Sequence, residues 1–323
     1  MNEAIQTETP ELPLGVYRAR FRADAAQHLP KWTGSAWRGV FGRALRCAVC
    51  VTRARSCEGC LLLRNCPYPY LFETPLLAGS GAPTPYVLVP GEARRGHGEG
   101  PGETVALGLV LIGERALGML PYVIHALERA GERGLTTRRV HLALEGVQAW
   151  DSGAGAWRPI YTPGAPLAGA SPLHVAPPPV PRRLTVHLLS PLRMRTRGCL
   201  LRPEAMDFAQ FFRAVARRIQ ALARVHGGAV DSAVYPRLVR LAAEVPLVDP
   251  QLEWRDWVRY SSRQRTRMRI GGVIGRFLVE DANLAPFWPW LWLGQWVHAG
   301  RSTTMGLGRY RIEADGLPPL PEW

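Results

Sequence analysis

Five of the six cysteines of the chain lie between Cys47 and Cys66. They form two C-x2-C pairs, Cys47 with Cys50 and Cys57 with Cys60, followed by Cys66. Short spacers of this kind let thiolates converge on a tetrahedral Zn²⁺ ion at about 2.3 Å. We expect Cys50, Cys57, Cys60 and Cys66 to be the ligands, because Cys47 still belongs to a predicted helix.

The same thiolates could instead hold an iron–sulfur cluster, or could be reduced structural cysteines. The chain begins with the acidic, polar segment "MNEAIQTETPELPLG", which is unlike a signal peptide. Clustered cysteines without a secretory signal favour a metal in a reducing cytoplasm over disulfides. A site filled by four sulfur ligands would be structural, since it leaves no open position for catalysis.

A second pattern consists of arginines at alternate positions. If Val258–Ile270 is one strand, side-chain alternation places five arginines on one face, about 6.6–7 Å apart. The phosphates of an extended RNA backbone have a comparable spacing, so this face could follow several of them. A solvated charged face is the alternative, although no acidic residue in the segment balances the charge. Arg193 and Arg195 repeat the pattern near an earlier strand; the five residues are Arg259, Arg263, Arg265, Arg267 and Arg269.

Among the eight histidines, His28 follows the first predicted strand and lies close to Lys31. A general base for RNA cleavage needs an imidazole of near-neutral pKa beside a cation that stabilises the charge of the phosphorane. His28 and Lys31 meet that need. A loop histidine without a catalytic role is the alternative, and His298 is a second candidate.

Three glycines lie in the segment from Gly300 to Tyr310, "GRSTTMGLGRY", which leads into the last predicted strand. Glycine lets backbone N–H groups approach a polyanion, and it equally permits a tight turn. The segment leads into a strand and does not open a helix, which disfavours a nucleotide-cofactor loop. The sequence contains no P-loop, H-E-x-x-H or G-x-S-x-G motif, and no cluster of acids that a two-metal nuclease would need.

The elements that must position these residues follow the same plan in both halves. In the first half, periodicity predicts strands at 14–21, 104–113 and 138–150 and helices at 34–46 and 114–134. In the second half it predicts strands at 182–195 and 303–314, helices at 206–228 and 284–300, and a strand pair over 254–280 that turns near Gly271 and Gly272. Two β-α-β-β-α-β units in tandem are a doubled ferredoxin-like pattern.

The predicted fold class is therefore α+β, with two tandem ferredoxin-like (RRM-like) domains and a small cysteine-rich metal-binding insert in the first. Residues 1–165 form the first domain, with the insert at 47–66. Residues 166–182, rich in Pro, Gly and Ala, form a linker. Residues 183–323 form the second domain, with the glycine-rich loop at 300–308.

The charge balance indicates the class of partner. The chain carries 40 basic and 26 acidic residues, a net charge of +14, and Lys31 is its only lysine. Such an arginine excess favours a polyanion, above all a nucleic acid. A membrane is not expected, because the most apolar segment, 277–300, carries Glu280 and Asp281 and is interrupted by Pro286 and Pro289. We expect a cytoplasmic protein.

Three blocks of the chain resemble the CRISPR-associated Cas-six endoribonuclease family. They are the glycine-rich segment from Gly300 to Tyr310, the block "WRDWVRYSSRQRTRMRIGGVIG" at 254–275, and "WRGVFGRALRCAVCVTRARSCEGCLLLRNCPYPYLFE" at 37–73, which is similar to a cysteine-bearing subgroup. The middle of the chain adds little to this resemblance.

The resemblance implies a protein that binds the hairpin of a CRISPR repeat RNA and cleaves precursor RNA without a metal. The internal 2′-hydroxyl would attack the next phosphate and leave a 2′,3′-cyclic phosphate, and the guide RNA would stay bound. In the family the glycine-rich loop contacts RNA or supports the sheet; Gly300, Gly306 and Gly308 match it, and Arg301 and Arg309 are the expected RNA ligands.

In such proteins a histidine in or near the first helix often acts as the base. Here the helix itself has none, so Arg38 joins His28 and Lys31 as a catalytic candidate. A non-catalytic subunit of a CRISPR effector complex, which holds the repeat hairpin without cutting it, is the alternative function. A zinc-bearing DNA-binding protein is a third.

Overall fold

The computed structural model describes residues 11–23, 29–30, 32–91, 104–136, 139–228, 233–261, 266–280 and 283–323. These residues form two compact units. The N-terminal unit comprises Pro13–Leu173 together with Leu320–Trp323, and the C-terminal unit comprises the described residues of His174–Pro319 together with Glu11 and Leu12. The boundary at 173/174 falls within the predicted linker, whereas the last four residues belong to the N-terminal unit.

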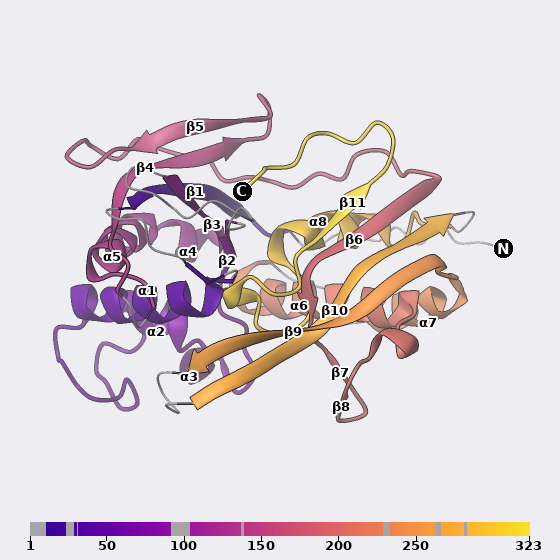
Figure 1. Cartoon of the computed structure of the whole chain (residues 1–323), viewed down its shortest axis with the longest axis horizontal. Helices are drawn as coiled ribbons and strands as arrows, with labels where there is room; N and C mark the ends of the chain where they lie inside the picture. The colour runs from indigo at the N-terminus through magenta and orange to yellow at the C-terminus, as the bar shows by residue number, and fades with distance from the viewer. Residues whose placement is uncertain are drawn as a thin grey trace. The chain divides into compact units, whose positions relative to one another are not determined.

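The N-terminal unit contains a five-stranded antiparallel sheet in the order β2-β3-β1-β4-β5 (Figure 1). Without the added strand β5, strand order and helix placement are those of a ferredoxin-like fold. The elements are β1 (Leu14–Ala23), α1 (Gly34–Val49), α2 (Pro67–Phe72), α3 (Pro75–Ala78), β2 (Tyr86–Pro90), β3 (Thr104–Ile112), α4 (Glu114–Leu117), α5 (Leu120–Arg133), β4 (Leu142–Asp151) and β5 (Ala156–Tyr161).

Alternation along β1 separates the two faces of this sheet. Tyr17, Ala19 and Phe21 are buried in a core that α1 and α5 complete. The ring of Phe21 lies 4.8 Å from that of Trp37 of α1, measured between centroids. The predicted helix over 34–46 is confirmed, and its apolar stripe faces the core because its large apolar residues recur at helical spacing.

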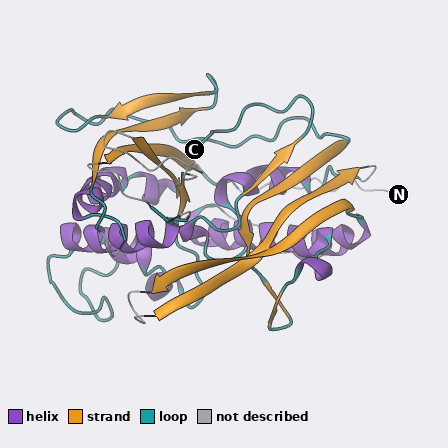
Figure 2. Cartoon of the chain, in the orientation of Figure 1, coloured by secondary structure: helices purple, strands orange, loops and turns teal. Residues whose placement is uncertain are grey.

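The C-terminal unit contains a four-stranded antiparallel sheet in the order β11-β6-β10-β9, again the ferredoxin-like order (Figure 2). A two-stranded hairpin, β7 with β8, follows β6. The elements are β6 (Arg183–Leu192), β7 (Arg195–Thr196), β8 (Cys199–Leu200), α6 (Phe208–His226), α7 (Val234–Leu241), β9 (Val248–Ser261), β10 (Thr266–Glu280), α8 (Trp288–Val297) and β11 (Tyr310–Glu313). Two such units agree with the predicted α+β class.

The tryptophan-rich helix α8 is buried along nearly its whole length, as its sequence, apolar except for Gln295, predicts. Trp288 donates from its indole nitrogen to the carbonyl oxygen of Pro178 at 2.6 Å. No helix in the described part of the chain has the length and apolar character that crossing a membrane requires.

The predicted course of the β9–β10 hairpin is wrong. Thr266 pairs with Ser261, so the chain reverses before Thr266, and Gly271 and Gly272 lie inside β10. These glycines are needed for close approach: a Cβ on Gly271 would lie 2.4 Å from the ring of Trp254, and one on Gly272 would lie 2.6 Å from the carbonyl oxygen of Leu192.

This reversal also removes the single strand predicted for Val258–Ile270. The ladder pairs Arg259 with Met268 and Val258 with Arg269, so Arg259 lies on β9 and Arg269 lies on β10. The premise that one strand carries all five arginines is therefore wrong, and Arg263 and Arg265 lie outside the described residues.

Candidate nucleic-acid interface

Three of the predicted RNA-binding arginines gather in the C-terminal unit. Arg193 follows β6, Arg195 opens β7, and Arg301 lies in the glycine-rich loop. The backbone N–H of Arg301 donates to the carbonyl oxygen of Arg193 at 2.9 Å. Burial lowers the pKa of Arg193, and the positive charges of Arg195 and Arg301 lower it further, while Asp256 acts in the opposite sense. We call these three residues the arginine cluster.

One member of the cluster is anchored to the sheet, and the other two are open to solvent. Arg193 is partly buried and donates from Nη1 to the carbonyl oxygen of Gly271 at 2.9 Å. Arg195 and Arg301 are exposed. Close by in sequence, the guanidinium of Arg202 lies 4.0 Å from the ring centroid of Trp254. Converging guanidinium groups are favourable where an anion such as a phosphate binds between them.

The glycine-rich loop packs tightly against the end of β6. Gly300 and Gly308 have φ angles of +74° and +70°, which favour glycine. A Cβ on Gly300 would lie 2.6 Å from the carbonyl oxygen of Arg193, and one on Gly308 would lie 1.8 Å from that of Ala299. The loop therefore needs glycine at both positions to bring Arg301 beside Arg193.

Several backbone N–H groups of the loop already have protein partners. Gly308 donates to the carbonyl oxygen of Pro191 at 3.1 Å, and Arg309 donates to Oγ of Ser190 at 2.8 Å. Gly306 and Gly308 are buried. These contacts give the glycines a structural role, and their direct contact with RNA stays a prediction.

His298, the second histidine candidate, is fully buried beneath the loop. Its Nδ1 donates to the carbonyl oxygen of Leu307 at 3.1 Å. Burial, with the nearby positive charge of Arg309, lowers the pKa of His298 to about 3. The imidazole is therefore neutral and inaccessible to RNA, so His298 supports the loop and is not a general base.

The cysteine insert lies between α1 and α2. The four predicted ligands Cys50, Cys57, Cys60 and Cys66 line one cavity of about 240 Å³. Oγ1 of Thr52 lies 3.8 Å from Sγ of Cys50 and 3.9 Å from Sγ of Cys60. The hydrogen bond from Thr52 lowers the pKa of Cys50, whereas burial raises that of Cys57 to about 11.

The described side chains do not support a formed metal centre in this insert. Within the described ranges, no three His, Cys, Asp or Glu residues are grouped closely enough to hold a metal ion. The cysteines share a cavity without converging on one point, so the zinc ion, or the iron–sulfur cluster, stays a prediction.

Of the three predicted catalytic residues, the structure describes Arg38. Arg38 lies on α1, with its guanidinium carbon 5.5 Å from the ring centroid of Phe72. Arg269 is exposed on β10. The side chains of Arg259 and Arg267 lie outside what the structure describes, as do four whole residues: His28, Lys31, Arg263 and Arg265.

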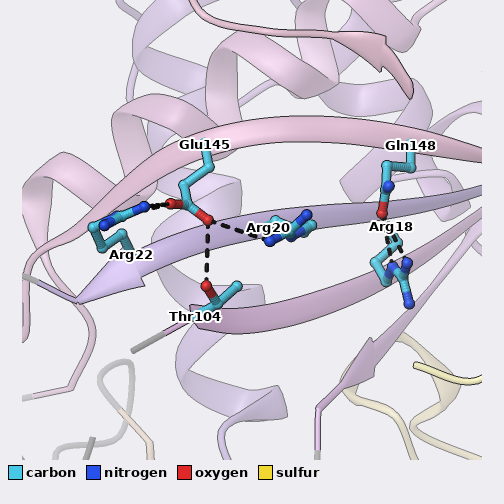
Figure 3. Close-up of polar contacts among 6 residues, drawn as sticks. All are labelled: Arg18, Arg20, Arg22, Thr104, Glu145 and Gln148. Atoms are coloured by element: carbon cyan, nitrogen blue, oxygen red, sulfur yellow. Dashed lines mark hydrogen bonds and ion pairs between the residues drawn. The ribbon is translucent and has the colours of Figure 1, made fainter. Parts of the chain in front are cut away.

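A further cationic surface was missed by the sequence analysis. Arg18, Arg20 and Arg22 of β1 lie on the sheet face opposite the core, together with Glu145 and Gln148 of β4 (Figure 3). The alternation in "RARFR" at 18–22 carries this signal, because a strand that buries Ala19 and Phe21 must turn its arginines to the other face.

Comparison with known proteins identifies the family. Residues 186–310 match the model of the CRISPR-associated endoribonuclease Cas6, and residues 12–173, half of the chain, match the model of the AF_1859 N-terminal domain. No curated protein matches the chain.

Solved structures share the fold over almost the whole chain. The product complex of Cas6 (TTHB231) is 14% identical with a TM-score of 0.56, and the match covers 93% of this chain and 99% of that one. For Thermus thermophilus Cas6 (TTHB231), the values are 14%, 0.54, 94% and 99%. For the product complex of Cas6 (TTHA0078), they are 17%, 0.51, 94% and 100%. Residues 186–310 therefore belong to the family that the Cas6 endoribonuclease model describes, and nearly the whole chain shares the fold of solved Cas6 structures.

Proposed function

We propose that this protein cleaves precursor CRISPR RNA within its repeats, and that it binds the repeat as a hairpin. The observation that carries the proposal is the arginine cluster inside the segment that matches the Cas6 model. The backbone bond from Arg301 to Arg193 brings these residues together, and the positive charges of Arg195 and Arg301 act on Arg193. Neighbouring cations of this kind suit the phosphates of an RNA backbone. The net charge of +14 is consistent with such a partner.

The proposed reaction uses the RNA's own 2′-hydroxyl. A general base removes the proton of that hydroxyl, the 2′-oxygen attacks the adjacent phosphorus, and the 5′-oxygen leaves with a proton from a general acid. The products end in a 2′,3′-cyclic phosphate and a 5′-hydroxyl. His28 is the proposed base, and Lys31 and Arg38 are the proposed cations that stabilise the phosphorane.

Retention of the product follows from the same contacts. Cleavage breaks one phosphodiester and leaves the other phosphates of the hairpin intact, so it removes few of the ionic contacts. We therefore propose that the guide RNA stays bound. Similar structures include Cas6 bound to its product and a partial Cas6-RT-Cas1–Cas2 complex, which supports RNA and other CRISPR proteins as partners.

The cysteine insert is proposed to hold a structural metal, zinc in the first place. The support is the C-x2-C spacing together with the shared cavity of the four cysteines. Its role would be to stabilise the segment between α1 and α2, with no part in the cleavage reaction.

The alternative is a subunit that binds the repeat hairpin without cutting it. The observation that favours it is the absence of histidine from α1. Incubation of the protein with labelled repeat RNA in EDTA separates the two functions. Cleavage at the base of the hairpin supports the endoribonuclease, and its loss in His28→Ala with unchanged binding assigns the base. Binding without any cleavage by the unaltered protein would support the alternative.

A further inference from the structure

The open face of the N-terminal sheet carries three arginines in one row. Arg18, Arg20 and Arg22 alternate along β1 with the core residues, and the ladder places Arg18 between Gly108 of β3 and Gln148 of β4. Figure 3 shows all three guanidinium groups on this side of the sheet. The row is built into the strand register, so its spacing is fixed by the sheet.

Arg20 and Arg22 share one carboxylate, that of Glu145. Glu145 accepts from Nε of Arg22 at 2.7 Å, lies 3.8 Å from Nη2 of Arg20, and accepts from Oγ1 of Thr104 at 3.3 Å. The side chains of Arg20 and Arg22 remain 47% and 59% exposed. Since one negative charge faces two guanidinium groups, this part of the face keeps a positive charge that a polyanion can neutralise.

Arg18 is oriented differently and joins the row to an aromatic surface. Its Nε and Nη2 donate to Oε1 of Gln148 at 3.0 and 2.8 Å. Its guanidinium carbon lies 4.5 Å from the ring centroid of Trp157 on β5. Burial lowers the pKa of Arg18, and the neighbouring positive charge of Arg20 lowers it further.

Three tryptophans form this aromatic surface. The ring of Trp157 lies 5.3 Å from that of Trp150 and 5.4 Å from that of Trp323, edge to face in both cases. Trp323 rests directly on the sheet, since a Cβ on Gly108 would lie 2.1 Å from its ring. The carbonyl oxygen of Glu322 accepts from Nη1 of Arg18 and from Nε1 of Trp157, both at 3.3 Å. All three rings are partly exposed.

We propose that this face binds unpaired nucleotides of an RNA. Bases would stack on Trp157 and Trp323, and Arg20 and Arg22 would pair with the phosphates that follow. Rows of cations beside aromatic rings suit single strands, because every unpaired base offers a flat face, whereas paired bases are hidden in a duplex. The inference rests on the proposed function only in taking RNA as the partner.

The test measures the affinity of the full chain for two labelled RNAs, an unstructured oligonucleotide and a blunt hairpin without unpaired ends. Arg20→Gln with Arg22→Gln should weaken binding of the unstructured RNA and flatten its salt dependence by about 1.4 in log–log slope, that is about 0.7 per phosphate contact. Hairpin affinity should be unchanged. Arg129→Gln with Arg133→Gln on α5 removes the same charge elsewhere in this unit and serves as the matched control.

Variants of Trp323 test the inference independently if the Arg20→Gln, Arg22→Gln variant folds poorly. Trp323→Ala should weaken binding of the unstructured RNA at least about five-fold, and Trp323→Phe should retain most of it, as expected for stacking. Equal losses for both RNAs, unchanged affinity for the unstructured RNA, or tighter binding by Trp323→Ala would overturn the inference. A protein that binds the unstructured RNA through this face but neither binds nor cleaves the repeat hairpin would refute the proposed function alone.

Discussion

The backbone N–H of Arg301 donates to the carbonyl oxygen of Arg193 at 2.9 Å, and this bond joins the glycine-rich loop to the end of β6. Two segments more than a hundred residues apart in sequence thus bring Arg193 and Arg301 beside each other. The glycines at 300 and 308 allow this approach, and the arginines beside them supply the charge. In this protein the loop therefore acts mainly by placing a cation.

Neutralising the exposed members of the arginine cluster should weaken RNA binding through its salt dependence. Arg195→Gln with Arg301→Gln removes two proposed phosphate contacts, so the slope of log affinity against log salt should fall by about 1.4 to 1.8. Titrations of repeat RNA at several salt concentrations measure it. Arg237→Gln with Arg240→Gln, exposed on α7, is the control with the same loss of charge. Equal slopes for the two double variants would show that the cluster does not contact the RNA.

Replacing Gly308 should destabilise the C-terminal unit. In Gly308→Ala the new Cβ would overlap the carbonyl oxygen of Ala299, and φ of +70° is itself unfavourable for alanine. We expect a loss of at least about 2 kcal/mol in the free energy of unfolding, measured by urea titration. Gly316→Ala is the matched control, because its φ is +75° but nothing lies within 4 Å, so only the conformational cost remains. Similar losses for both variants would contradict the packing role.

Acid should destabilise the protein through His298. Its pKa is about 3 in the folded state, below the roughly 6.5 of an unfolded histidine, so the unfolded chain binds this proton more tightly. The free energy of unfolding should then fall as pH drops from about 6.5 towards 3, by about 1.4 kcal/mol per pH unit. Above pH 6.5 this group should add no pH dependence.

The variant His298→Asn isolates this contribution. Asparagine tolerates the φ of 61° and can still donate to Leu307, but it does not titrate. Unfolding free energies measured from pH 7 to pH 4 should therefore show a shallower decline in the variant. A decline as steep as that of the unaltered protein would mean that other groups cause the acid sensitivity.

Removing the proposed metal ligands should affect stability before chemistry. Cys57→Ser with Cys60→Ser should abolish the bound metal and lower the melting temperature of the N-terminal unit, since a structural metal contributes directly to folding. Metal analysis of the purified protein together with thermal melting measures both effects. Cys47→Ser, an exposed cysteine that is not a predicted ligand, should change neither. Unchanged metal content and melting in the double variant would refute the site.

The sequence predicted those elements whose burial pattern depends only on residues nearby in the sequence. Alternation along β1 and the apolar spacing of α1 are local patterns that burial enforces, and both elements formed as expected. The β9–β10 hairpin did not, because its two consecutive glycines resemble a turn. They are instead required by Trp254 and Leu192, and these contacts depend on strand register.

The candidate site shows the same limit. Arg193, Arg195 and Arg301 could be named from composition and resemblance, but their convergence depends on a hydrogen bond between distant segments. The row of arginines on β1 was readable from its alternation. Its tryptophan partner was not, because nothing in the sequence near Trp323 indicates that these last residues pack on Gly108 of the N-terminal sheet.

The chemistry of the cleaved end tests the central claim most directly. Repeat RNA incubated with the protein in EDTA would be analysed by mass spectrometry, alongside the same RNA with a 2′-deoxy nucleotide at the cleavage position. We predict a fragment that ends in a 2′,3′-cyclic phosphate from the first RNA and no cleavage of the second. A 3′-hydroxyl end, cleavage of the deoxy substrate, or an intact RNA in both reactions would contradict it.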